Sequence, residues 1–112
     1  MTTKTTITKA RRFLDDMVAP YRWEDDELRE HLQAAVRRLN ALAPTTRYLP
    51  DGTMVDFIAL PSDDNAAIPV DDKYAESLAL YIAYLAYFND ATDTVNAERA
   101  ASCLQRAEGM MV

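Results

Sequence analysis

Residues 72–88 read Asp72-Lys73-Tyr74-Ala75-Glu76-Ser77-Leu78-Ala79-Leu80-Tyr81-Ile82-Ala83-Tyr84-Leu85-Ala86-Tyr87-Phe88. Helical spacing places two apolar stripes on this segment. They consist of Tyr74, Leu78, Tyr81, Leu85 and Phe88 in the first, and of Leu80, Tyr84 and Tyr87 in the second. In a small domain, a helix that is apolar on two faces needs either a central position among other helices or burial against a second subunit. The sequence therefore predicts a helix from Asp71 or Asp72 to about Asn89, covered in one of these two ways.

Three further helices are predicted around this segment. The first is capped by Thr6 or Thr8 and continues to Ala19-Pro20, where proline stops it. The second ends at Ala43-Pro44, and the last runs from Asp93 or Thr94 to about Gly109 and packs on residues 72–88. Their apolar positions are Ile7, Ala10, Leu14 and Met17 in the first, Leu28, Leu32, Ala35, Val36, Leu39 and Leu42 in the second, and Ala97, Ala100, Ala101, Leu104 and Met111 in the last.

Length and composition predict one all-α domain over residues 1–112. A chain of 112 residues is large enough for one core, and the presence of only 2 glycines disfavours a turn-rich sandwich or barrel. Residues 1–6 lack the apolar core of a signal peptide, so they are predicted to form a short flexible tail. The expected fold is a small four-helix domain.

The segment 44–71 is predicted to be a long acidic loop or a short β-hairpin arm between the second and third helices. Pro44, Pro50 and Pro61 exclude a regular helix, and residues 51–72 contain six aspartates with no Lys or Arg. Within it, Met54-Val55-Asp56-Phe57-Ile58 partly alternates, and the preceding Pro50-Asp51-Gly52 is a turn signal.

Charge and cysteine content exclude several classes of function. The formal net charge is −6, whereas tight binding of a nucleic-acid backbone needs clustered Lys and Arg. Cys103 is the only cysteine, so an intrachain disulfide is impossible and a reducing compartment is expected. The apolar run Leu78–Phe88 is shorter than the roughly 20 residues of a membrane-spanning helix, so no membrane role is predicted.

No catalytic, metal or cofactor-binding residues are predicted. His31 lies near Glu27 and Glu30, but further convergent ligands are missing, and a helix-surface histidine is the preferred interpretation. The acidic run 24–27 could suggest a divalent-cation cluster, but consecutive helical positions point in different directions and cannot converge on one ion. The preferred interpretation is a favourable interaction with the positive end of the helix dipole. Asp63-Asp64-Asn65 lacks the glycine and distal glutamate of a calcium loop. Cys103 is interpreted as a small, semi-buried residue.

Two aromatic and basic clusters admit a second interpretation. Trp23 with Tyr21 could form a stacking platform, but a large aromatic before a helix more often packs in the core, here against Leu28. Arg37 and Arg38, together with Arg29, form a modest basic surface that is either a solvated helix face or a contact for an acidic partner.

Taken together, these segments resemble the head–tail adaptor proteins of tailed bacteriophages. The resemblance extends from about Phe13 to Ala107. It rests on the aromatic-Arg-Trp motif with Asp26 and Leu28, on residues 69–87, and on small residues of the last helix. The motif and small residues are Tyr21, Arg22, Trp23, Asp26, Leu28, Ala100, Ala101 and Leu104. One departure is Glu24, which stands where Ser, Thr or Pro is more typical, so Asp25 is expected to be the helix cap.

The resemblance implies a structural virion protein without enzymatic activity. It implies a ring, commonly dodecameric, that docks beneath the portal, extends the DNA channel and joins the capsid to the tail. The implied partners are the portal protein, the next neck or tail protein and other copies of the chain, while genomic DNA only passes through. The implied location is the virion neck, after assembly in the host cytoplasm.

Surfaces for such contacts are predicted from apolar and basic residues that a four-helix core leaves over. The candidate subunit or partner interface consists of Leu80, Tyr84, Tyr87, Met54, Phe57, Ile58, Arg37 and Arg38. The net charge also suits an alternative function, that of a small acidic helical protein that regulates or masks a basic partner.

Overall fold

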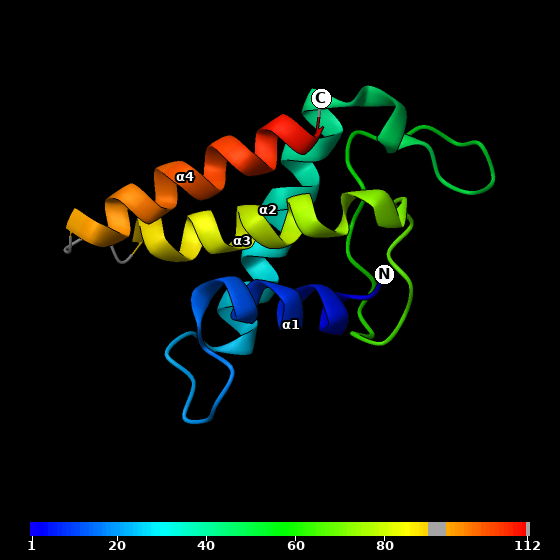
Figure 1. Ribbon diagram of the computed structural model, residues 1–112. Coiled ribbons are helices and arrows are strands. Elements are labelled where there is room, and N and C mark those ends of the chain that lie inside the picture. Colours follow the sequence, from blue (N-terminus) through cyan, green and yellow to red (C-terminus); the bar gives the residue numbers. More distant parts are fainter. Residues whose placement is uncertain (90–93, 112) are drawn as a thin grey trace.

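Four α-helices run through the part of the chain that the computed structural model describes, residues 1–89 and 94–111 (Figure 1). The elements in order are α1 (Thr3–Leu14), α2 (Asp25–Leu42), the 3-10 turn η1 (Pro44–Arg47), the 3-10 turn η2 (Asp72–Tyr74), α3 (Ala75–Asn89) and α4 (Thr94–Met111). Within these residues there is no strand, only two isolated β-bridges. The all-α prediction is confirmed.

Helix α3 occupies the centre of the fold. It contacts α1, α2 and α4, and its contact with α4 is the most extensive between any two helices. Figure 1 shows α4 lying along one side of α3, α1 on the other side, and α2 crossing behind them. Of the two ways to cover this apolar helix, the structure realises the central position.

Small residues let α4 approach α3 closely. The buried face of α4 contains Ala100, Cys103, Ala107 and Met111, whereas Ala97 and Ala101 are exposed. The Ser77 hydroxyl on α3 donates a hydrogen bond of 2.8 Å to the Ala107 carbonyl, which ties the two helices together across the contact. The predicted packing of these helices is confirmed, but two of the predicted contact residues are wrong.

The first helix starts and ends earlier than the sequence pattern predicts. Thr2 caps it, because the Thr2 hydroxyl accepts from the Thr5 amide while the Thr5 hydroxyl accepts from the Thr2 amide. Residues 3–6 are therefore helical, and the predicted flexible tail is wrong. The helix ends at Leu14, followed by Asp15 in the left-handed region, so Met17 lies outside the helix and is exposed.

The second helix follows its predicted stripe. Its fully buried apolar residues are Leu28, Leu32, Ala35, Val36 and Leu39. Three acidic side chains lie in its first turn, where they interact favourably with the helix dipole. The cap position is Glu24, which makes no side-chain cap hydrogen bond, so the expected cap at Asp25 is wrong. The predicted end before Pro44 is confirmed.

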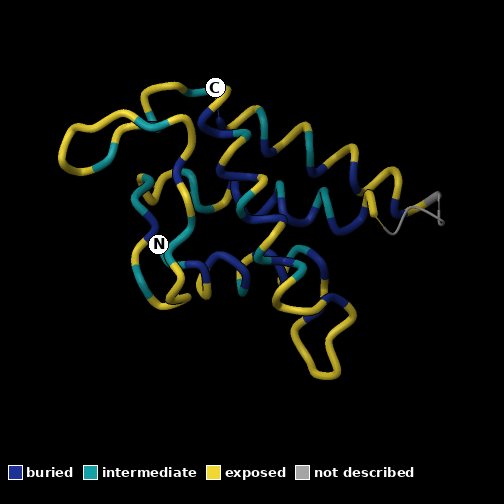
Figure 2. Tube along the Cα trace, turned by 180° about the vertical axis from the view of Figure 1, so that it is seen from behind, coloured by how far each residue is buried: buried dark blue, intermediate teal, exposed yellow. Residues whose placement is uncertain are grey.

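The segment between α2 and η2 covers part of the core instead of forming a free arm. Ile58 and Ile68 are buried, and Val55, Leu60 and Val70 pack against the core. The β-pairing of residues 44–71 consists of two isolated bridges, one between Tyr48 and Met54 and one between Ala67 and Thr2. Figure 2 shows that residues near 48–57 project from the body as an exposed loop, as do residues near 16–22.

Candidate interaction surface

An ionic cluster around the buried Arg11 joins the end of α1 to the exposed Asp25 at the start of α2. Arg11 is 5% exposed, and its guanidinium lies 2.7 Å from the Asp16 carboxylate and 2.6 Å from that of Asp25. The same guanidinium donates to the Trp23 carbonyl at 2.9 Å. A buried charge is tolerated only when it is paired and hydrogen-bonded, and Arg11 satisfies both conditions.

Asp16 closes the chain between these helices into a fixed loop. It is 8% exposed, and its carboxylate accepts from the Arg22 amide at 2.9 Å and from the Trp23 amide at 3.3 Å. Sequence reasoning missed both Arg11 and Asp16. The available signal was the position of Arg11, which follows Ala10 and precedes Leu14 on the apolar side of α1. We call residues 16–22 the first loop.

The first loop exposes apolar side chains at its tip. Val18 is 82% exposed, and Met17 and Tyr21 are also exposed. The Arg11 guanidinium lies against the Tyr21 ring, 3.9 Å from the centroid of that ring. Trp23, by contrast, is buried and meets the Tyr87 ring edge-on at 6.0 Å, so its assignment to the core is confirmed.

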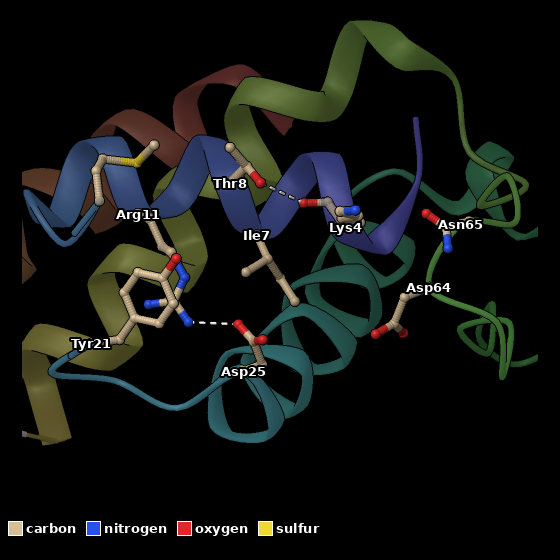
Figure 3. A pocket seen from close by; sticks show the side chains of 9 residues that line it. Lys4, Ile7, Thr8, Arg11, Tyr21, Asp25, Asp64 and Asn65 are labelled. Carbon is tan, nitrogen blue, oxygen red and sulfur yellow. Dashed lines mark hydrogen bonds and ion pairs between the residues drawn. The ribbon is translucent and has the colours of Figure 1, made fainter. Parts of the chain in front are cut away.

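Beside the first loop lies a pocket of ≈ 430 Å³ between α1, the start of α2 and residues 64–65 (Figure 3). Its acidic side chains are already neutralised, because Asp25 pairs with Arg11 and Asp64 pairs with Arg29 at 3.1 Å. Figure 3 shows the Tyr21 ring and the Arg11–Asp25 pair together at one end of this pocket. These groups support the fold and leave no reactive constellation among the lining residues.

We call residues 48–57 the second loop. Polar side chains of α2 form hydrogen bonds with the backbone of the segment that follows this loop. Asn40 accepts from the Ile58 amide at 2.8 Å. Gln33 accepts from the Leu60 amide at 2.9 Å and donates to the Ile58 carbonyl at 3.0 Å. These bonds satisfy backbone groups that no strand or helix satisfies. The second loop itself exposes Tyr48, Met54 and Phe57.

The dependence of the second loop on Asn40 gives a stability prediction. Asn40→Ala should lower the free energy of unfolding by about 1–3 kcal/mol, because the buried Ile58 amide loses its acceptor. Denaturant titration followed by circular dichroism measures the loss. Met54→Ser serves as control, since an exposed change should stay within about 0.5 kcal/mol. Equal stability of the two variants would contradict the assignment of Asn40 as an anchor.

The predicted interface residues divide into core and surface. Leu80 is 0% exposed, and Tyr87 and Ile58 are also buried, so their prediction as free interface residues is wrong for the folded chain. Their burial follows from the central position of α3 and from the return of residues 58–68 over the core. The remaining candidates are Tyr84, which is half-buried, Met54, Phe57 and Arg37, which are exposed, and Arg38, which is half-buried.

Both basic candidates have partners within the chain. The Arg37 guanidinium lies 3.9 Å from the centroid of the Phe57 ring, and Arg38 pairs with Glu108 of α4 at 2.9 Å. A cation over an aromatic face is attracted by the ring quadrupole, so Arg37 helps to fix the base of the second loop. The motif residue Asp26 is exposed, while Leu28 is fully buried.

A row of aromatic rings continues along α3. Tyr81 and Tyr84 lie with their centroids 5.2 Å apart, and Tyr84 and Phe88 lie 5.9 Å apart. Phe88 is exposed at the end of this row. The surplus apolar surface of α3 therefore lies on the side of Tyr84 and Phe88 rather than on that of Leu80 and Tyr87.

His31 is buried, and its interpretation as a surface histidine is wrong. Its Nε2 lies 3.7 Å from the Glu27 carboxylate, which is too long for a hydrogen bond, and has no hydrogen-bond partner. Within residues 1–89 and 94–111, no group of three or more His, Cys, Asp or Glu side chains is placed to hold a metal ion. Burial lowers the pKa of His31 from its usual 6.5, and Glu27 and Glu30 oppose part of this shift.

This lowered pKa makes stability depend on His31 in mild acid. The unfolded chain binds more protons than the folded one between the two pKa values, so the contribution of His31 is full above about pH 6.5 and decreases as the pH falls below it. His31→Gln should therefore lose less unfolding free energy than the wild type between about pH 7.5 and pH 5.5. Equal losses in denaturant titrations at the two pH values would refute this prediction.

The surroundings of Cys103 and of Asp63 favour structural roles for these residues. Cys103 is buried, and burial raises the pKa of its thiol, with Arg106 opposing part of the shift, so the nucleophilic thiolate is disfavoured. The Asp63 carboxylate accepts from the Asn65 amide at 2.9 Å in an exposed turn, which agrees with the predicted solvated loop. Among the described residues, no helix has the length and apolarity needed to cross a membrane.

Comparisons with known proteins leave the family of this chain open. No family model, no curated protein and no solved structure matches it. Its functional interpretation therefore depends on the resemblance in the sequence and on the surfaces described above.

Proposed function

We propose that this protein is a head–tail adaptor, a structural virion subunit that forms a ring beneath the portal and connects capsid to tail. The main support for the proposal is that two exposed loops with apolar side chains project from one helical body. The first loop is held by the Arg11–Asp16 pair, and the second is followed by a segment held by Asn40 and Gln33. Fixed loops with exposed apolar tips suit docking, because little ordering is needed on binding.

Charge supports the part of the proposal that concerns DNA. A neck channel must let the genome pass without holding it, and a chain with 18 Asp and Glu against 12 Lys and Arg repels phosphates on balance. The basic side chains Arg11, Arg29 and Arg38 are also paired with carboxylates of the same chain. DNA is therefore proposed to pass through the ring and not to bind it.

A binding experiment with the portal tests the proposal. The purified chain should co-sediment with the portal complex encoded in the same genome, and Val18→Asp combined with Met17→Asp in the first loop should weaken this binding. Both side chains are exposed, so the double variant should keep the helical circular dichroism of the wild type. Failure of the wild-type chain to bind the portal would contradict the proposed function.

A second candidate is an acidic protein that masks a basic partner. It is favoured by the aspartates of residues 51–72, which are exposed at all six positions. Binding of this kind should weaken steeply with salt and tolerate Val18→Asp, because it depends on charge rather than on apolar contact. Portal binding that is sensitive to Val18→Asp and Met17→Asp distinguishes the adaptor from this alternative.

A further inference from the structure

A basic cleft of ≈ 390 Å³ lies between α1 and α4 over α3. It is lined by Phe13, Leu14 and Asp15 at the end of α1, by Tyr87 of α3, and by Arg99 and Arg106 of α4. Arg99 and Arg106 are seven residues apart and therefore lie on one face of α4, two turns from each other. We call this region the α1–α4 cleft.

Both arginines of the cleft lie near aromatic rings. Arg99 lies 5.8 Å from the centroid of the Tyr87 ring, and Arg106 lies 5.7 Å from that of Phe13. Within the described part of the chain, neither guanidinium forms a salt bridge, in contrast to Arg11, Arg29 and Arg38. The cleft thus combines apolar side chains with two guanidinium groups and only one carboxylate, that of Asp15, so a net positive charge remains. Such a cleft suits an acidic segment carrying apolar side chains.

The second loop of the same chain has this chemistry. It exposes Asp51 and Asp56 together with Tyr48 and Met54. Asp51 accepts from the Thr53 amide at 2.9 Å, and this hydrogen bonding lowers the pKa of its fully exposed carboxyl. Asp51 is therefore ionised at neutral pH and is displayed to solvent at the tip of the loop.

The loop and the cleft lie at opposite ends of the molecule, whose longest dimension is 44 Å. In Figure 1 the second loop projects at the right, whereas the carboxyl end of α1 lies at the left. The two surfaces cannot meet within one chain but can meet between two copies. A contact between two different surfaces of identical chains is heterologous, and it closes into a ring or continues as a filament.

We propose that the second loop of one copy docks in the α1–α4 cleft of another copy, with Asp51 and Asp56 facing Arg99 and Arg106. The inference deepens the proposed function and rests on it in one respect, because a ring subunit needs a heterologous neighbour. Its physical basis, complementary charge around an apolar centre, concerns self-association alone. The contact is expected to be weak and salt-dependent, since its charges lie at the surface.

Charge reversal on each side tests the contact. Analytical ultracentrifugation of the wild type at low salt should show association that increases with concentration and decreases with added salt. Arg99→Glu with Arg106→Glu, or Asp51→Lys with Asp56→Lys, should weaken it about tenfold or more, because like charges then face each other. An equimolar mixture of the two double variants should associate like the wild type, since each supplies the surface that matches the other.

Two exposed substitutions outside both surfaces serve as controls, Arg12→Glu and Glu98→Lys, and circular dichroism verifies that every variant is folded. A wild type that stays monomeric up to about 1 mM would overturn the contact. So would double variants that associate like the wild type, or a folded mixture that fails to associate. Portal binding by a strictly monomeric chain would contradict this contact but not the proposed function. Self-association without any portal binding would contradict the proposed function but not this contact.

Discussion

Arg11→Ala should lower the free energy of unfolding by about 3–5 kcal/mol at neutral pH. The substitution leaves the Asp16 carboxylate buried without its cation and removes the donor to the Trp23 carbonyl. Because small domains have only about 5–15 kcal/mol of stability, this loss should be visible as a large decrease in the denaturation midpoint. Denaturant titration followed by circular dichroism measures it.

The neighbouring arginine provides a matched control. Arg12 is exposed on the same helix, so Arg12→Ala should change the free energy of unfolding by no more than about 0.5 kcal/mol. Replacing Arg11 and Asp16 together by Met and Leu should recover much of the loss, because no charge is then left buried and unpaired. If Arg11→Ala were as stable as Arg12→Ala, the ionic cluster would not be what holds the first loop.

Trp23→Ala should cost about 3–5 kcal/mol, which is typical of removing a large aromatic from a core. Trp23 is buried against the Tyr87 ring and is the point at which the first loop returns to the body of the fold. Thermal and denaturant unfolding both report the change. Restoration of part of the stability by Trp23→Phe is expected, because an aromatic ring then refills part of the space.

Tyr21→Ala is the matched control for Trp23. Its ring is exposed and lies against the Arg11 guanidinium, a contact worth about 0.5–1 kcal/mol at such sites. The two aromatic residues of one motif should thus differ several-fold in their effect. Similar losses for both variants would show that Trp23 is not the anchor of the loop.

The part of the fold that can be predicted is the part specified by the local periodicity of apolar residues. The stripe from Leu28 to Leu39 specifies α2 on its own, and the apolar faces of residues 72–88 specify a central helix once the other helices are counted. The end of α1 is different. It depends on pairing of Arg11 with Asp16 and Asp25, and such pairing is invisible to a pattern that follows apolar residues only.

The surfaces were less predictable than the helices. Leu80 and Tyr84 look alike in the sequence, because both lie on an apolar stripe, and only the positions of the other helices decide that Leu80 is buried. Ile58 is buried through hydrogen bonds of its backbone to Asn40 and Gln33, which are distant in sequence. Likewise, the α1–α4 cleft combines residues that no local pattern connects.

The proposed role as a ring-forming adaptor of the portal is tested by electron microscopy of the purified protein mixed with its cognate portal. We expect a ring of added density, coaxial with the portal channel and attached to one face of the portal. Portal particles without added density, in the presence of an excess of the folded wild-type chain, would contradict the proposed role.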